Sequence, residues 1–269
     1  MYHNNQQGKK IYYEVINDKS VKGTIDFLNG VMASTNSWKN QYEAFEKLGY
    51  KIILHDFIGQ LKSDKFVGQY SFDKHTQDLK GLLDELKIEK AHLIGTSYGG
   101  EVAMKYAINY PFMVESLSII DSVSEVDDQM VKSIEEWIEL AVTGSGEEFF
   151  NGMLPSIYGK TYIKENSDFL SKRAKLMNNV PLDYFMGQIG LYHTFINDVY
   201  MTNVLHKINC PTLVVCGKDD ILKPVKFSKL IQDNIKGSVL VLIPDCGHVT
   251  ILEKPNELND LLMDFINKE

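Results

Sequence analysis

The residues most able to do chemistry in this chain lie at positions 93–100, where the sequence reads Leu-Ile-Gly-Thr-Ser-Tyr-Gly-Gly. An apolar, strand-like run ends at Gly95, a helical pattern opens at Gly99, and Ser97 stands on the turn between them. The flanking glycines suit a sharp strand-to-helix turn, because a Cβ would not fit where the two elements cross. Such a turn lifts the hydroxyl above a sheet and beside the free N–H groups of a helix start, which favour a developing anion. The pattern is typical of a nucleophilic serine.

A serine hydroxyl is a poor nucleophile at neutral pH, so it needs a base and an acid that orients the base. Two polar clusters later in the chain could supply these groups, and each follows a strand-like run. The first cluster ends in Asp219-Asp220 and the second ends in His248. The carboxyl ends of parallel strands lie at one edge of the sheet, where ligands bind. We therefore expect both clusters to lie near Ser97.

Other residues could fill these two roles. The chain has seven histidines, but only His248 follows a strand-like run at this place in the chain order. The others fall in predicted strands, in a helix, in the segment 124–206 or, for His3, in an N-terminal segment that we expect to be loose. For the acid we favour Asp220, with its neighbour Asp219 and Asp121, at the end of an earlier strand, as alternatives.

Strand-like and helical segments alternate along much of the chain. Strand-like runs cover residues 10–15, 24–28, 51–55, 91–94, 116–120, 211–216 and 239–243, and amphipathic helices cover 72–86, 225–235 and 255–267. Such alternation predicts an α/β fold with a mainly parallel central sheet and helices on both of its faces.

The alternation breaks between residues 124 and 206, where only helical patterns occur, at 128–142, 147–158, 162–177 and 182–195. We interpret residues 124–206 as a helical cap inserted into a core domain of residues 1–123 and 207–269. Large apolar residues are frequent in this segment. The candidates that could face the serine and bind substrate are Phe149, Phe185, Met186 and Tyr192.

Together these features resemble the α/β-hydrolase superfamily, in its capped branch of enol-lactonases and carboxylesterases. The resemblance covers nearly the whole chain and rests on five segments, at residues 29–32, 56–63, 95–100, 217–220 and 247–248. It implies an α/β-hydrolase fold with a helical cap. It also implies that Ser97 is the nucleophile, His248 the base and Asp220 the acid.

The resemblance further implies an oxyanion hole built from the backbone N–H groups of Val31 and Tyr98, with Met32 beside it on the substrate side. Two such N–H groups stabilise the tetrahedral oxyanion, each contributing about 3 kcal/mol. The chain departs from the usual His-Gly dipeptide in this loop, because it has Asn29-Gly30. We therefore expect a different side chain to hold the oxyanion loop in place.

The activity implied is that of a serine hydrolase, which cleaves a carboxylic ester, thioester or lactone with an apolar moiety through an acyl-enzyme. Relatives also cleave carbon–carbon bonds of β-diketones, and the fold alone does not choose among these reactions. The alternative is a ligand receptor or signalling partner that keeps the triad but turns over little. Sustained release from p-nitrophenyl esters would distinguish an enzyme from a receptor.

Composition limits the partners and location. The net charge of −8 argues against nucleic acid or an anionic membrane as partner, and no apolar run is long enough to span a bilayer. Cys210, Cys216 and Cys246 are odd in number and lack metal-ligand spacing, so they read as reduced thiols. We expect a cytoplasmic protein, monomeric or homodimeric, that uses no cofactor or metal and acts on a small molecule.

Overall fold

The computed structural model describes residues 1–66, 68 and 70–268. Eight strands form one sheet in the order β1-β2-β4-β3-β5-β6-β7-β8. The strands are β1 (Tyr2–Asn4), β2 (Lys10–Ile16), β3 (Thr24–Leu28), β4 (Lys51–His55), β5 (Ala91–Thr96), β6 (Val114–Ile120), β7 (Thr212–Gly217) and β8 (Val239–Ile243). The six strands from β4 to β8 in this order are parallel, and β1 and β2 pair antiparallel at one edge. The predicted mainly parallel α/β sheet is confirmed.

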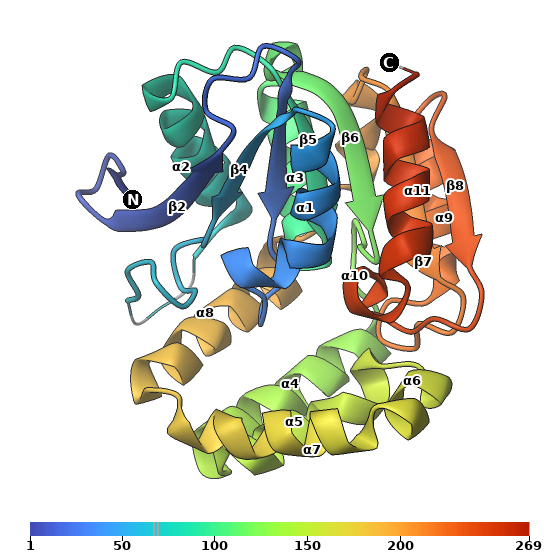
Figure 1. Cartoon of the computed structure of the whole chain (residues 1–269). Helices are drawn as coiled ribbons and strands as arrows, with labels where there is room; N and C mark the ends of the chain where they lie inside the picture. The colour runs from blue at the N-terminus through green and yellow to red at the C-terminus, as the bar shows by residue number, and fades with distance from the viewer. Residues whose placement is uncertain (67, 69, 269) are drawn as a thin grey trace.

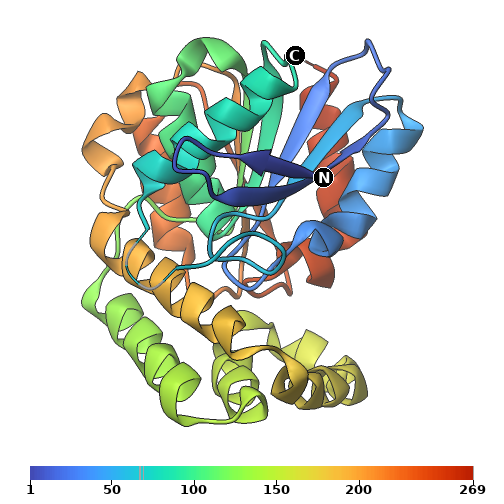
Figure 2. The ribbon, with the colours of Figure 1, turned by 90° about the vertical axis from the view of Figure 1, so that its left-hand side faces the viewer.

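Helices cover both faces of this sheet (Figures 1 and 2). One face carries α1 (Lys39–Lys47), α10 (Thr250–Glu253) and α11 (Pro255–Ile266), and the other carries α2 (Phe72–Glu85), α3 (Tyr98–Asn109) and α9 (Val225–Asn234). Buried residues therefore form an apolar core on each side of the sheet. The central strands β3, β5 and β6 are buried along nearly their whole length because both of their faces are covered.

The chain between β6 and β7 is helical and contains no strand among its residues. It forms α4 (Asp128–Thr143), α5 (Gly146–Ile157), α6 (Lys160–Glu165), α7 (Ser167–Leu176) and α8 (Leu182–Asp198), with the short 3-10 helices η3 (Met177–Asn179) and η4 (Thr202–Lys207). Figure 1 shows α4 to α7 as a layer below the ends of β6 and β8, while α8 runs back to the core. Within the described ranges, no helix is both long and apolar enough to cross a membrane.

Two local expectations were wrong. The helix expected at 162–177 is divided into α6 and α7 at Asn166, whose φ of −117° leaves the helical range. The N-terminal segment is ordered, because Tyr2–Asn4 pairs with β2. His3 is buried there, with its Nδ1 2.5 Å from Glu85 Oε2. Three residues are too few for a strand pattern to show in the sequence.

Candidate active site

The turn at Ser97 is as sharp as its flanking glycines suggest. Ser97 has a φ of 51° and a ψ of −121°, a conformation that costs free energy unless its surroundings hold it. A Cβ on Gly95 would lie 2.3 Å from the Gly99 carbonyl oxygen, and one on Gly99 would lie 2.1 Å from that of Leu28. The Ser97 N–H donates to the Ile120 carbonyl at 2.8 Å. The turn is thus fixed by close backbone approach and by its bond to β6.

The structure brings Ser97, His248 and Asp220 together from three separate loops. Ser97 Oγ lies 3.0 Å from His248 Nε2, and His248 Nδ1 lies 2.8 Å from Asp220 Oδ2. The second oxygen of Asp220 accepts hydrogen bonds from the N–H groups of Leu222 and Lys223, at 2.9 and 2.8 Å. Since Asp220 can only accept when ionised, Nδ1 is assigned as the donor and Nε2 as the acceptor from the serine.

The imidazole of His248 is buried, and its charged form is nevertheless favoured. Burial lowers the pKa of His248, but the negative charge of Asp220 and its hydrogen bond to Nδ1 outweigh this effect and raise the pKa above the ordinary 6.5. Asp219, the neighbouring candidate for the acid, is exposed at the surface. By raising the pKa of the buried imidazole, Asp220 makes it a better acceptor for the proton of Ser97.

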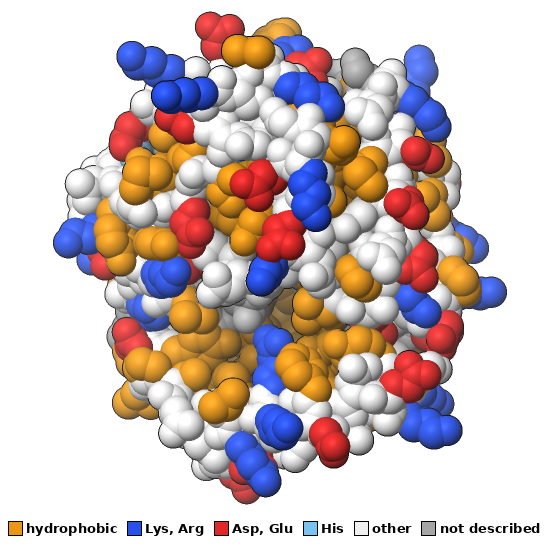
Figure 3. Space-filling view, in the orientation of Figure 1, with side chains coloured by type: hydrophobic (Ala, Val, Ile, Leu, Met, Phe, Trp, Pro, Cys, Tyr) orange, Lys and Arg blue, Asp and Glu red, His pale blue; other side chains and the backbone are white. Residues whose placement is uncertain are grey.

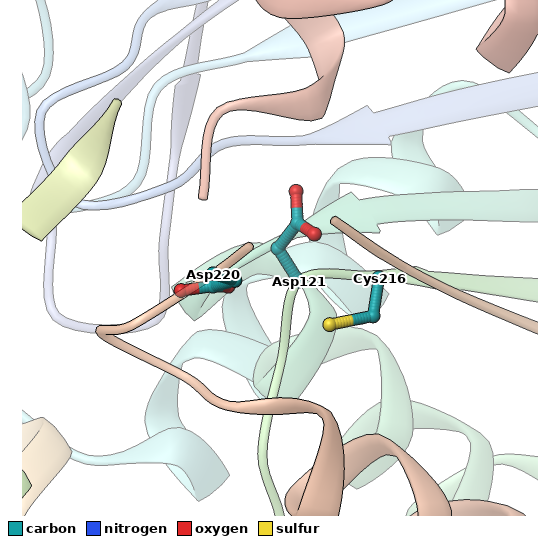
Figure 4. Close-up of side chains that lie close together, drawn as sticks. All are labelled: Asp121, Cys216 and Asp220. Atoms are coloured by element: carbon teal, nitrogen blue, oxygen red, sulfur yellow. The ribbon is translucent and has the colours of Figure 1, made fainter. Parts of the chain in front are cut away.

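Asp121, the other candidate for the acid, lies in the interior beside Asp220 and Cys216 (Figure 4). Its carboxylate accepts hydrogen bonds from the N–H groups of Gly217, at 2.9 Å, and Thr250, at 3.2 Å. Burial and the nearby charge of Asp220 raise the pKa of Asp121. Asp121 therefore connects the loop that leads to Asp220 with the segment that follows His248, and we regard it as a positioning residue.

The same three side chains could each offer one atom to a metal ion, since these atoms lie within 4.8 Å of one another. Both oxygens of Asp121 and both of Asp220 already accept hydrogen bonds. Burial raises the pKa of the Cys216 thiol, which disfavours the thiolate that a metal requires. The cluster is thus satisfied by the protein's own donors and does not fit a metal ion.

The two residues expected to supply the oxyanion donors lie at the same cavity as Ser97. Val31 and Tyr98 both line it. Within the described part of the chain, neither of their backbone N–H groups donates to another protein group. The loop is held by Gln60, whose side-chain amide donates to the carbonyls of Gly30 and Val31 at 2.7 and 3.2 Å, and whose oxygen accepts from Asn29. Sequence reasoning missed Gln60, because it lies 30 positions away from the loop.

A cavity of about 130 Å³ lies over Ser97, between the core and the helices that follow β6. Figure 3 shows the surface hollowed between these two parts, with hydrophobic side chains around the hollow and a basic side chain inside it. Met32 and Tyr192 line the cavity, as expected. The other lining residues from the helical segment are Ile134, Trp137, Phe150, Ile157, Tyr158, Arg173 and Phe195.

Three of the expected cap residues do not line this cavity. Phe149 is fully buried and packs against Phe185, with ring centroids 5.5 Å apart. Met186 is 40% exposed and lies on the outer surface near Lys62. The helix phase explains the difference on α5, since Phe150 instead of Phe149 takes the position that faces the cavity.

A buried ion pair anchors the loop that carries Asp220. Lys223 Nζ lies 2.7 Å from Glu101 Oε1, and both side chains are almost fully buried. Glu101 belongs to α3, the helix that begins after Ser97, and Lys223 follows Asp220. The pair therefore joins the elements that carry Ser97 and Asp220, and no spacing of residues in the sequence predicts it.

The geometry agrees with comparisons to known proteins. A family model described as the alpha/beta hydrolase fold matches residues 24–255. The chain is 27% identical to a proline iminopeptidase of Lactobacillus crispatus, over 97% of this chain and 96% of that protein. It is 28% identical to the solved structure of MGS-M2, an alpha/beta hydrolase enzyme from a Medee basin deep-sea metagenome library, with a TM-score of 0.94 and coverage of 99% and 97%. It is also 28% identical to Est816, described as an N-acyl homoserine lactone degrading enzyme, with a TM-score of 0.83 and coverage of 98% and 100%.

Proposed function

Because the chain belongs to the alpha/beta hydrolase fold family, we propose that it is a serine hydrolase that cleaves a carboxylic ester, thioester or lactone through an acyl-enzyme. The observation that carries the proposal is the continuous path of hydrogen bonds from Ser97 Oγ through His248 to Asp220. It begins at the floor of an apolar cavity, where two backbone N–H groups remain free to bind an oxyanion.

In the first half of the proposed reaction, Ser97 Oγ attacks the substrate carbonyl while its proton passes to His248 Nε2. Negative charge then develops on the carbonyl oxygen, and the N–H groups of Val31 and Tyr98 stabilise it. Asp220 keeps the proton on Nδ1 and stabilises the imidazolium that forms. Collapse of the tetrahedral intermediate breaks the bond to the leaving alkoxide or thiolate, which takes the proton from His248.

In the second half, water enters and gives a proton to His248 Nε2 as it attacks the acyl carbonyl. The same two N–H groups stabilise the second oxyanion. Release of the acid returns the proton to Ser97. The first and last proton transfers use the same 3.0 Å contact between Ser97 Oγ and His248 Nε2, in opposite directions.

The lining of the cavity favours an ester, thioester or lactone as the substrate. It disfavours an amino-terminal peptide bond, the substrate that the name of the iminopeptidase relative implies. A substrate with a free amino terminus carries an ammonium group, which needs a carboxylate partner when water is excluded. Among the described residues that line the cavity, none is Asp or Glu. The likeness to Est816 supports the inclusion of lactones.

The proposal is tested with a fluorophosphonate probe and a panel of p-nitrophenyl esters, lactones, a β-diketone and a prolyl amide. Wild-type protein should be labelled once, on Ser97, and should release p-nitrophenol steadily over many turnovers. Ser97→Ala should lose labelling and lower turnover by several orders of magnitude, leaving only binding and oxyanion effects. Ser171→Ala, an exposed serine on α7, serves as the matched control and should behave as wild type.

Three results would contradict the proposal. Labelling that persists in Ser97→Ala would show that another residue is the nucleophile. A single burst without further release would favour a receptor over an enzyme. Faster cleavage of the prolyl amide or the β-diketone than of every ester and lactone would reject the proposed substrate class.

A further inference from the structure

Arg173 is the only arginine among the 28 basic residues of this chain. It belongs to α7 and lines the cavity that also contains Ser97 and His248. All other basic residues are lysines, so a guanidinium occurs at this one place. Arginine offers five N–H donors in a planar fork that matches a carboxylate, and it stays charged at every physiological pH.

The guanidinium of Arg173 has neither an ion-pair partner nor a hydrogen-bond acceptor among the residues that the structure describes. Its side chain is half-buried, and its Cζ lies 6.0 Å from the ring centroid of Phe150. Lys223, the other lysine or arginine that lines the cavity, differs because Glu101 neutralises it at 2.7 Å. Among the described residues, Arg173 is thus the lysine or arginine of this cavity that forms no ion pair with a carboxylate.

The rest of the cavity favours an anion beside Arg173. The described lining residues include no Asp or Glu that would repel an anion or compete for the guanidinium. Most of the lining is apolar, and in such surroundings charges attract more strongly than in water. A guanidinium without a partner in an apolar cavity gains most from a charged acceptor that the substrate brings.

We propose that Arg173 binds a carboxylate of the substrate, so that the natural substrate is an ester, thioester or lactone with a second, ionised carboxyl group away from the scissile carbonyl. This inference rests on the proposed function of Ser97. One guanidinium matches the single charge and flat shape of a carboxylate. A phosphate monoester, with a charge near −1.5 to −2, would be left partly uncompensated in a cavity of about 130 Å³.

The substrate would then bridge two parts of the protein. Its scissile carbonyl would lie against Ser97 on the core, and its carboxylate against α7 of the helical segment. The apolar residues between them, Trp137 and Phe195 among others, would pack on the intervening carbon atoms. Such an arrangement selects for the length of the substrate as well as for its charge.

The test compares two p-nitrophenyl esters of nearly identical shape, the half-ester of glutaric acid and its carboxamide analogue. Wild-type protein should prefer the carboxylate in kcat/KM by about 10- to 100-fold, the range for a hydrogen-bonded charged pair. Arg173→Met should abolish this preference. Lys172→Met removes the same charge from the adjacent, exposed position on α7 and should keep the wild-type preference.

A carboxylate-to-carboxamide ratio in Arg173→Met equal to that of wild type would overturn the proposal, as would a wild-type preference for the carboxamide. Tighter binding of inorganic phosphate than of glutarate would also overturn it. Calorimetric titration of Ser97→Ala with glutarate, which should bind only while Arg173 is present, needs no turnover. It therefore separates a failure of this inference from a failure of the proposed hydrolase activity.

Discussion

The side chains of Asn29 and Gln60 hydrogen-bond to each other, with Asn29 Nδ2 3.1 Å from Gln60 Oε1. Asn29 also accepts a hydrogen bond from the indole N–H of Trp38, at 2.9 Å. Gln60 in turn donates to the carbonyl of Gly30. That carbonyl and the N–H of Val31 belong to one planar, trans peptide, so they point in opposite directions. A bond that holds the carbonyl therefore keeps the N–H of Val31, a residue that lines the cavity, directed away from Gln60.

Gln60→Glu tests this support. The new carboxylate would face the two carbonyl oxygens that Gln60 now binds as a donor, and the loop should turn away from its present position. We expect kcat to fall by about 10- to 100-fold with little change in KM, somewhat less than the effect of deleting one oxyanion donor. Gln77→Glu, the same change at an exposed position on α2, is the control. An unchanged kcat in a folded Gln60→Glu protein would reject this role.

Much of the fold, and the residues proposed to carry the chemistry, could be inferred from local patterns in the sequence. The alternation of strands with helices predicts the parallel sheet, because a helix that connects two neighbouring strands returns the chain to the same end of the sheet. Ser97, Asp220 and His248 each follow a strand of the parallel part of the sheet, and parallel strands bring those ends together. Position in the chain was therefore enough to place these side chains near one another.

The supporting residues could not be inferred in this way. Gln60 and Arg173 reach the site from a loop and a helix far from Ser97 in the sequence, and their neighbours carry no recognisable spacing. Phe149 and Phe150 have the same chemistry, and only the packing of α5 decides which of them faces the cavity. One signal was present in the sequence for Arg173, since it is the single arginine in a chain rich in lysine.

The second prediction concerns the acid. Asp220→Asn should lower kcat by about 1,000- to 10,000-fold, because an amide at this position disfavours the imidazole tautomer that accepts the serine proton. Asp121→Asn should cost far less, since Asp121 contacts backbone N–H groups and not the imidazole. Asp219→Asn, at an exposed position, should leave kcat unchanged. Steady-state kinetics on one ester compares all three variants, and a larger loss at Asp121 would reassign the acid.

The pH dependence of kcat/KM gives a third prediction. His248 must be neutral to accept a proton, and Asp220 raises its pKa above 6.5 despite burial. Activity should therefore be present at alkaline pH and fall as the pH drops through a midpoint above 6.5. In Asp220→Asn the residual activity should show this midpoint at a lower pH, because burial alone lowers the pKa. A midpoint that does not move between the two proteins would count against the pairing.

The fourth prediction uses the two adjacent phenylalanines of α5. A cavity of about 130 Å³ is close to the size that holds a benzene ring, so short acyl chains should fill it. Up to that length, each methylene should raise kcat/KM about fourfold, from about 0.8 kcal/mol of burial. Phe150→Val enlarges the cavity and should move the optimum to longer chains. Phe149→Val, the matched change beside it, should lower thermal stability without moving the optimum; equal optima in all three proteins would show that the cavity does not select acyl length.

The last prediction concerns Glu253, whose carboxylate connects the loop of His248 to the helical segment. Its Oε2 accepts hydrogen bonds from the N–H groups of Gly159, at 3.0 Å, and Gly247, at 2.9 Å, and its Oε1 accepts from Val249 at 3.3 Å. Gly159 lies between α5 and α6, and the other two residues flank His248 on either side. One side chain therefore holds both the loop of His248 and the segment between α5 and α6.

Glu253→Gln replaces one accepting oxygen with an amide donor, which must face at least one of these three N–H groups. A buried donor left without a partner costs about 1–3 kcal/mol, so the unfolding temperature should fall by several degrees. The loop that carries His248 should also shift relative to Ser97, and kcat should fall by a larger factor than KM rises. Glu135→Gln, an exposed glutamate on α4, should change neither quantity. If Glu253→Gln lowers the unfolding temperature but leaves kcat at the wild-type value, the carboxylate stabilises the fold without positioning the base.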